Sequence, residues 1–179
     1  MAETPTASQT VGPFFSIGLD SFLRKEVFAN GSGDRVTVRG RVLDGHDQPV
    51  PDAVLEIWAP GTGTDECTAE GYPVGFGRVA TNDFGEFEFV VPRPAANEHE
   101  GRKQAPHLAV LVFMRGLLRH LVTRLYFPDE PANALDPVLQ LVPEERRRTL
   151  IATAAPEKTA EFSWDIHLQG EQETVFYEV

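Results

Sequence analysis

Apolar and polar residues alternate along several short segments of the chain, which is the pattern of a strand with one buried face. The clearest segment is 36–43, and a second one, 53–59, follows a break that contains Asp44-Gly45 and Pro49. Asp-Gly favours a tight reversal, and proline cannot continue a paired strand. These two segments predict successive strands that form a hairpin or the edge of a sandwich.

Further strands are predicted by the same alternation, or by an unbroken apolar run, at residues 77–81, 86–91, 108–113, 121–127, 162–168 and 174–177. The run 108–113 is apolar throughout, which favours a strand buried on both faces. Residues 82–85 form a predicted turn in which Gly85 adopts a left-handed conformation. Residues 92–106 are predicted to be irregular, and 61–75, rich in glycine and threonine, is a candidate loop wall of a functional site.

One segment has the signals of a helix. Residues 143–151 begin with proline, continue with two glutamates and then carry three arginines, an order that complements a helix dipole. Many short strands, turns rich in glycine and proline, and one or two short helices predict an all-β fold. We expect an antiparallel β-sandwich with long connecting loops, forming a single domain over residues 1–179.

The composition excludes several classes of function. The net charge is -11, so the surface repels nucleic acid and anionic membranes. Cys67 is the one cysteine, which leaves no intrachain disulfide and suits a reducing compartment. The sequence shows no secretory signal, no apolar run long enough to span a membrane, and no dinucleotide or P-loop motif. We therefore expect a cytoplasmic protein that binds neither nucleic acid nor membranes.

The histidines and arginines offer limited chemistry by themselves. Two metal ligands on one strand face need a spacing of two residues, and the five histidines lack that spacing. His107 opens an apolar strand, where a lone histidine is more often a hydrogen-bonded core residue than a ligand. Arg115 and Arg124 lie at opposite ends of the two most apolar strands. Each guanidinium could bind a carboxylate in a pocket or pair with a structural acid, and both interpretations stay open.

Longer motifs resemble the intradiol ring-cleaving dioxygenases. Residues 6–15, Thr-Ala-Ser-Gln-Thr-Val-Gly-Pro-Phe-Phe, are similar to the family's opening TPSQTxGPF/Y. Gly-Phe-Gly-Arg-Val-Ala-Thr at 75–81, Ala-Pro-His at 105–107 and Asp-Ile-His-Leu-Gln-Gly-Glu at 165–171 follow in the family's order. The resemblance covers nearly the whole chain. It implies a β-sandwich and cleavage of catechol rings by a ferric iron that two tyrosinates and two histidines hold.

The resemblance also implies that this chain does not bind the iron. The family presents its histidines as His-x-His, whereas this chain has His107-Leu108-Ala109 at that place. The family's tyrosine ligands would fall near Asp65 and Pro94, and this chain has no tyrosine at the expected spacing. We expect no catalytic residue and no metal ligand here. The chain would be an alpha-type subunit whose partner, a beta-type subunit, holds the Fe(III).

The resemblance further implies which residues face the shared site. Thr10, Gly12, Pro13 and Phe14 are expected to line its substrate side, and Arg115 to reach towards it. A guanidinium would help to capture an anionic catechol acid, and Gly-Pro would form a stiff wall that excludes water. The N-terminal arm, about residues 1–35, is expected to pack on the partner subunit.

The reaction implied by the resemblance is cleavage of 3,4-dihydroxybenzoate with O2 to 3-carboxy-cis,cis-muconate, a step of aromatic catabolism in the beta-ketoadipate pathway. The strand pattern alone is also compatible with a non-catalytic β-sandwich binding module, because a fold does not fix a function. Iron-dependent activity in the presence of a second chain would favour the dioxygenase subunit over the binding module.

Overall fold

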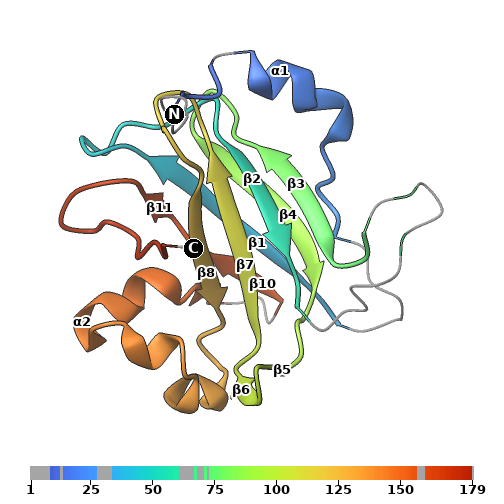
Figure 1. Ribbon diagram of the computed structural model, residues 1–179, viewed down its shortest axis with the longest axis vertical. Helices are drawn as coiled ribbons and strands as arrows, with labels where there is room; N and C mark the ends of the chain where they lie inside the picture. The colour runs from blue at the N-terminus through green and yellow to red at the C-terminus, as the bar shows by residue number, and fades with distance from the viewer. Residues whose placement is uncertain are drawn as a thin grey trace, which may run out of the picture.

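The computed structural model shows a chain built mainly of strands (Figure 1). The residues that it describes are 9–12, 14–27, 34–60, 67, 71, 73–156 and 160–178. The strands in these residues are β1 (Arg35–Leu43), β2 (Val54–Trp58), β3 (Phe76–Ala80), β4 (Glu86–Pro92), β5 (Asn97–His99), β6 (Arg102–Gln104), β7 (His107–Phe113), β8 (Leu121–Tyr126), β9 (Thr153–Ala154), β10 (Glu161–Ser163) and β11 (Ile166–His167). The helices are α1 (Phe15–Leu19) and α2 (Glu144–Arg147), with 3₁₀ turns η1 (Asp20–Phe22), η2 (Pro131–Leu135), η3 (Leu139–Leu141) and η4 (Arg148–Leu150).

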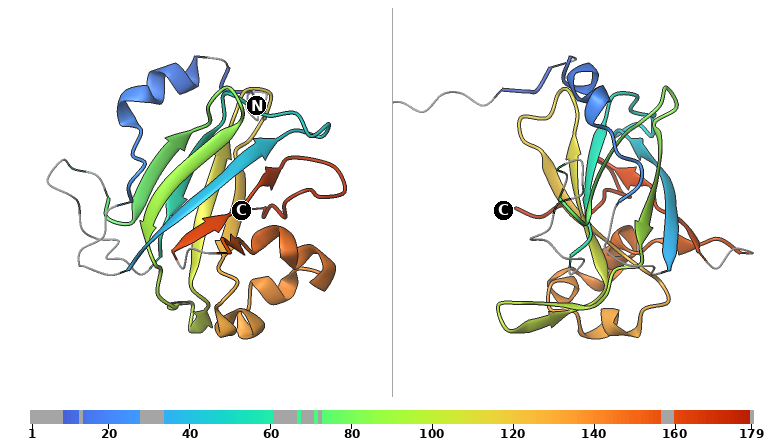
Figure 2. Two further views of the ribbon diagram at one scale, coloured as in Figure 1. Left: turned by 180° about the vertical axis from the view of Figure 1, so that it is seen from behind. Right: turned by 90° about the vertical axis from the view of Figure 1, so that its right-hand side faces the viewer.

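Two sheets form the sandwich that the strand pattern predicts, so the all-β class is confirmed. In the described residues one sheet has the order β11-β1-β10-β9, with β4 on the other edge of β1, and the second has the order β3-β2-β7-β8. Figure 2 shows the layers edge-on, with the C-terminus on the outer side of the sheet that contains β8. The pairing is mostly antiparallel, but β1 pairs in parallel with β10 and β11.

The predicted strand 162–168 is interrupted in its middle. Trp164 N donates to Arg39 O at 2.9 Å, and Arg41 N donates to Asp165 Oδ1 at 2.9 Å. The carbonyl oxygen of Trp164 therefore crosses directly over Gly40, where an added Cβ would lie only 1.8 Å from it. The chain splits into β10 and β11 because its backbone kinks over this glycine.

Strand β7 lies at the centre of the second sheet. Leu108, Val110 and Val112 point into the sandwich and are fully buried, whereas Ala109 and Leu111 on the outer face are only half-buried. The prediction that this strand is buried on both faces is therefore wrong. The outer face of β7 and β8 carries His107 and Arg124, whose surroundings are described below.

The core has two parts. Between the sheets, completely buried side chains such as Leu55, Ile57 and Phe89 pack together. A smaller cluster, which includes Tyr126 and Leu139, packs under the helical turns that gather beside the lower end of β8 in Figure 1. Because these turns cover one end of the β7–β8 face, they close off the polar groups described below.

The predicted helix at 143–151 is confirmed in place as α2 followed by η4. The prediction that 92–106 is irregular is wrong, because β5 and β6 form a hairpin there. Its turn is made by Glu100 and Gly101, both with positive φ. None of the helices in the described parts of the chain is long and apolar enough to cross a bilayer.

Candidate functional site

The N-terminal segment meets the loop between β7 and β8. Gly116 N donates a hydrogen bond to Thr10 Oγ1 at 2.8 Å. Gly116 has φ 92° and Gly12 has φ 75°, conformations that favour glycine because L side chains rarely adopt them. The structure thus brings Thr10 next to Arg115, two residues that the motifs assign to one wall. Pro13 and most of the loop 61–75, including Tyr72 and Asp65, lie outside the described residues.

Arg115 has one ionic partner among the described residues. Its Nε lies 2.8 Å from Asp52 Oδ2, while the arginine side chain is 58% exposed and the aspartate 19%. The pair therefore orients the guanidinium without burying it. Of the two interpretations that the sequence left open, the pairing with an acid is the one seen, and the exposed guanidinium keeps further N–H groups facing solvent.

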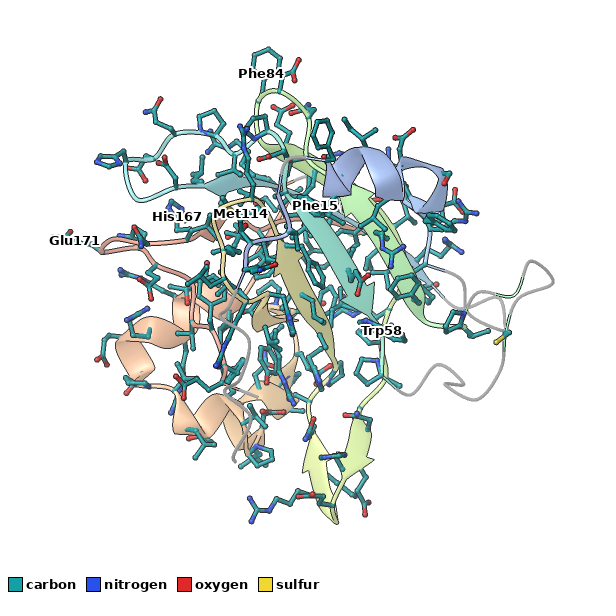
Figure 3. All side chains as sticks on the ribbon, turned by 45° about the horizontal axis from the view of Figure 1, so that its top comes forward. Phe15, Trp58, Phe84, Met114, His167 and Glu171 are labelled. Carbon is teal, nitrogen blue, oxygen red and sulfur yellow. The ribbon has the colours of Figure 1, made fainter. Side chains whose placement is uncertain are left out.

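The N-terminal segment carries a row of exposed apolar side chains. Phe14 is 77% exposed and Ile17 is 70% exposed, and Val11 and Phe22 are also largely accessible. Phe15, by contrast, is half-buried where α1 begins above the ends of the strands (Figure 3). A groove of about 200 Å³ separates this segment from the β7–β8 loop, lined by Gln9, Val11, Phe113, Met114, Leu117, Leu118, Arg119 and His120.

His107 lies on the outer face of β7 but is only 2% exposed. Its Nδ1 lies 2.8 Å from Ala105 O, and its ring centre is 5.6 Å from that of Tyr126. Burial, and secondly the charge of Arg124, lowers the pKa of His107 to about 4. The imidazole is therefore neutral at neutral pH, as expected for a hydrogen-bonded core residue.

Arg124 anchors a polar network that the sequence did not reveal. Its Nη1 donates to Gln104 Oε1 at 3.0 Å and lies 3.4 Å from the hydroxyl of Tyr126. That hydroxyl donates to Asp136 Oδ1 at 3.0 Å. Asp136 is 1% exposed and also accepts hydrogen bonds from the backbone of Ala105 and of two residues of the η2–η3 segment. An aspartate followed by proline resembles an ordinary turn signal, so nothing local indicated this role.

The two tyrosines of this face remain phenols rather than phenolates. Burial raises the pKa of Tyr126 well above its usual value, with Arg124 opposing that effect. Burial likewise raises the pKa of Tyr177 to about 12. Both residues are therefore protonated at neutral pH, because this buried environment disfavours the charged tyrosinate form.

Comparison with known proteins assigns the chain to a class that fits this fold. A family model described as "Dioxygenase" matches residues 19–170, and the chain belongs to that family. The alpha chain of protocatechuate 3,4-dioxygenase from Burkholderia cepacia is 41% identical over 198 aligned residues, covering 97% of each chain. The alpha chain from Pseudomonas putida is 38% identical, covering 99% of this chain and 97% of that one. The predicted membership, and the resemblance to the alpha-type subunits, are confirmed.

Related chains and structures place the similarity in context. The beta chain of protocatechuate 3,4-dioxygenase from Burkholderia cepacia is 32% identical, covering 87% of this chain and 74% of that one. The dioxygenase domain of a dioxygenase carbohydrate-binding protein fusion from Streptomyces sp. SirexAA-E has a TM-score of 0.62 at 23% identity, covering 96% of this chain and 100% of that one. Hydroxyquinol 1,2-dioxygenase from Pseudomonas putida DLL-E4 has a TM-score of 0.62 at 20% identity, covering 93% and 67%. These structures share the fold.

The residues of this chain do not fit the ferric site that the family implies. Ala109 has no ligand atom, and His107 has the positively charged Arg124 as a neighbour. No group of three or more histidine, cysteine, aspartate or glutamate side chains that could hold a metal occurs in the described parts of the chain. What the arrangement offers instead is an oriented, exposed guanidinium beside an N-terminal segment with an apolar surface.

Proposed function

We propose that this chain is the alpha subunit of a protocatechuate 3,4-dioxygenase. With an iron-bearing beta subunit it would cleave 3,4-dihydroxybenzoate with O2 to 3-carboxy-cis,cis-muconate, in the beta-ketoadipate pathway of aromatic catabolism. The observation that carries the proposal is the 41% identity to an alpha chain over 97% of both chains. The related beta chain supports an assembly of two different subunits. The single cysteine and the acidic surface favour a cytoplasmic enzyme.

The two subunits would have different roles in the reaction. The Fe(III), held by the beta subunit, would supply the chemistry of ring opening. This chain would supply no step of that chemistry, because it has Ala109 where a ligand is needed and its Tyr126 stays protonated. Its contribution would be to bind and orient the substrate and to keep water out.

The substrate side of this chain would consist of Thr10, Gly12, Pro13, Phe14 and Arg115. The hydrogen bond from Gly116 to Thr10 supports this assignment, because it holds the N-terminal segment against the loop that carries the arginine. Arg115 is exposed and already oriented by Asp52, so its remaining N–H groups could donate hydrogen bonds to the carboxylate of a catechol acid. A neighbouring wall without side-chain bulk at Gly12 would let a flat aromatic ring approach the backbone.

The N-terminal arm would form part of the interface with the beta subunit. Its exposed side chains are apolar and include Phe14 and Ile17, which a chain on its own would leave in water. Aromatic and aliphatic side chains of this kind are typical of the buried centre of subunit interfaces. The arm would thus serve the interface and the substrate wall together.

The proposal is tested by purifying the chain alone and after co-expression with its candidate beta subunit. The lone chain should be colourless and should take up no O2 with 3,4-dihydroxybenzoate. The co-purified pair should show a tyrosinate-to-iron absorption band and take up O2 with the same substrate. Colour and activity in the lone chain, or an inactive pair that contains a full complement of iron, would contradict the proposal. A non-catalytic binding module would show neither colour nor activity in either preparation.

A further inference from the structure

The side chain of Arg124 lies on the same face of the β7–β8 pair as His107 and Ala109. It stands directly opposite Ala109 in the β7–β8 ladder, and His107 stands opposite Tyr126. We propose that Arg124 is a built-in cation that keeps this chain free of metal, in addition to the missing ligand at Ala109. The inference deepens the proposed function and rests on it, because it explains how one subunit stays metal-free while its partner holds iron.

The register of the strands carries the first step. Side chains at 107 and 109 point to the same face of β7, since alternate residues of a strand share a face. Residues directly opposite each other in an antiparallel pair have Cβ atoms about 5 Å apart. A metal bound by histidines at both positions would therefore lie over the face occupied by the side chain of Arg124.

The hydrogen bonds of Arg124 carry the second step. Gln104 accepts from its Nη1 at 3.0 Å, and the Tyr126 hydroxyl lies 3.4 Å away. Both partners are themselves buried, so the guanidinium is anchored from the protein side. An arginine held in this way cannot move aside as freely as one on an open surface.

Electrostatics carries the third step. The guanidinium lies 3.4 Å from the Tyr126 hydroxyl, and the Tyr126 ring centre is 5.6 Å from that of His107. Burial lowers the pKa of His107 and the charge of Arg124 adds to this effect, whereas burial raises the pKa of Tyr126 and of Tyr177 and the charge of Arg124 opposes that rise. Asp136 is the buried anion of the same network and is linked to the guanidinium through the Tyr126 hydroxyl. A metal cation would add a second positive charge to a region where one buried carboxylate is already compensated.

The consequence is that restoring the missing histidine is not sufficient to create a metal site. In A109H the two imidazoles have the spacing of a two-histidine chelate on a strand, but the guanidinium remains beside them. In A109H/R124Q the charge is removed, while the glutamine amide can still donate to Gln104. Metal affinity should therefore appear only when both changes are combined.

The test is a titration of the full-length chain, purified alone, with Co²⁺ and Zn²⁺, followed by calorimetry and the visible Co²⁺ spectrum. We expect A109H to bind no more tightly than the unaltered chain, and A109H/R124Q to bind at least tenfold more tightly than A109H. A109H/R124K should behave like A109H, because lysine retains the charge. A109H/R102Q is the matched control, since it removes one positive charge from the exposed strand β6 and should also behave like A109H.

Equal affinity of A109H and A109H/R124Q, with both proteins folded by circular dichroism, would overturn the proposal. So would tight binding by A109H alone or by A109H/R124K. If the glutamine variant does not fold, A109H/R124M replaces it in the comparison, because methionine at position 124 is also uncharged. Because the titration uses neither partner nor substrate, its outcome is independent of whether the pair cleaves 3,4-dihydroxybenzoate.

Discussion

At the scale of single residues, Arg115 and Arg124 show how burial decides what a guanidinium does. Arg115 is 58% exposed and, within the part of the chain that the structure describes, pairs with Asp52 alone, so most of its hydrogen-bonding capacity faces solvent there. Arg124 is half-buried, lies on the sheet face and is tied to Gln104 and Tyr126. The first is suited to binding an anion from outside, and the second to balancing charge inside.

Replacing Arg115 separates its role towards substrate from its role in the ion pair. In the complex with the beta subunit, R115A should raise KM for 3,4-dihydroxybenzoate at least about tenfold, because it removes a charge-assisted contact of roughly 1.5–3 kcal/mol. D52N breaks the same ion pair but keeps the guanidinium, so KM should change by less than about twofold. Steady-state kinetics decide this. Equal effects of the two variants would show that only the ion pair matters.

The free energy of unfolding provides the control for the kinetic effect of R115A. Arg115 is more than half exposed, so loss of its ion pair should change the free energy of unfolding by less than about 1 kcal/mol. Urea unfolding of R115A measures this change. A loss of several kcal/mol would mean that the kinetic effect reflects a damaged fold.

His107 makes the fold sensitive to acid. Its pKa is about 4 in the folded chain, against about 6.5 in an unfolded one, so below pH 6.5 the unfolded state binds more protons. The stability contributed by the neutral imidazole is complete above pH 6.5 and is lost as the pH falls towards 4. Between pH 7 and pH 5 the loss should be about 2 kcal/mol from this group.

The variant H107N isolates that contribution, because an asparagine amide can still donate to the carbonyl of Ala105 but does not titrate. The free energy of unfolding, measured with urea at pH 7 and pH 5, should fall about 2 kcal/mol further in the unaltered chain than in H107N. The same pH dependence in both proteins would show that His107 is not buried in its neutral form.

At the scale of elements, the join between β10 and β11 depends on one glycine. A Cβ at Gly40 would lie 1.8 Å from Trp164 O and 2.8 Å from the Phe87 ring, so backbone must move to admit it. We expect G40A to lower the free energy of unfolding by about 3 kcal/mol or more. Gly18 in α1 has nothing within 4 Å of an added Cβ, so G18A should be neutral or stabilise by about 0.5–1 kcal/mol. Urea melts of both variants measure the contrast, and equal effects would contradict this account of the kink.

The N-terminal arm offers a test of the subunit interface. Phe14 is the N-cap residue of α1, a position where aspartate is favoured. The substitution F14D should therefore preserve the helix. It should nevertheless raise the dissociation constant of the pair at least about tenfold, because a charge replaces an apolar contact in a buried interface. Surface plasmon resonance with immobilised beta subunit gives the constant.

The control for F14D is L135D. Leu135 is 84% exposed and lies in η2, at the opposite end of the molecule from α1 (Figure 1). The same chemical change there should leave the dissociation constant within about twofold. If both variants associate as tightly as the unaltered chain, the arm does not contribute to the interface.

The sequence predicted the strands in which buried and exposed side chains alternate. It did not predict the polar strands or the kink between β10 and β11. Segment 36–43 matches β1 closely, because its inward side chains such as Val38 and Val42 are completely buried. The β5–β6 hairpin was missed because its residues are polar and largely exposed, so no hydrophobic period marks it. The kink at Trp164 was missed because it depends on a contact with Gly40, which is remote in the sequence.

At the scale of the whole molecule, the candidate site depends on contacts that local patterns do not encode. Thr10 and Gly116 are 106 positions apart, and their hydrogen bond follows only from the docking of the N-terminal segment on the β7–β8 loop. The assignment of these residues came from motif resemblance. The sequence left open a structural acid as the partner of Arg124, but the link to Asp136 through the Tyr126 hydroxyl was not predicted, because Asp136 comes from a turn beyond β8.

The central claim is that this chain forms the substrate wall of an active site whose iron belongs to another chain. A structure of the co-purified pair with bound 3,4-dihydroxybenzoate tests it most directly. We predict that all protein ligands of the iron come from the beta subunit, and that Arg115 and the segment that begins at Thr10 contact the substrate. Iron bound by a residue of this chain, or a substrate separated from Arg115 and Thr10 by other residues, would contradict the account.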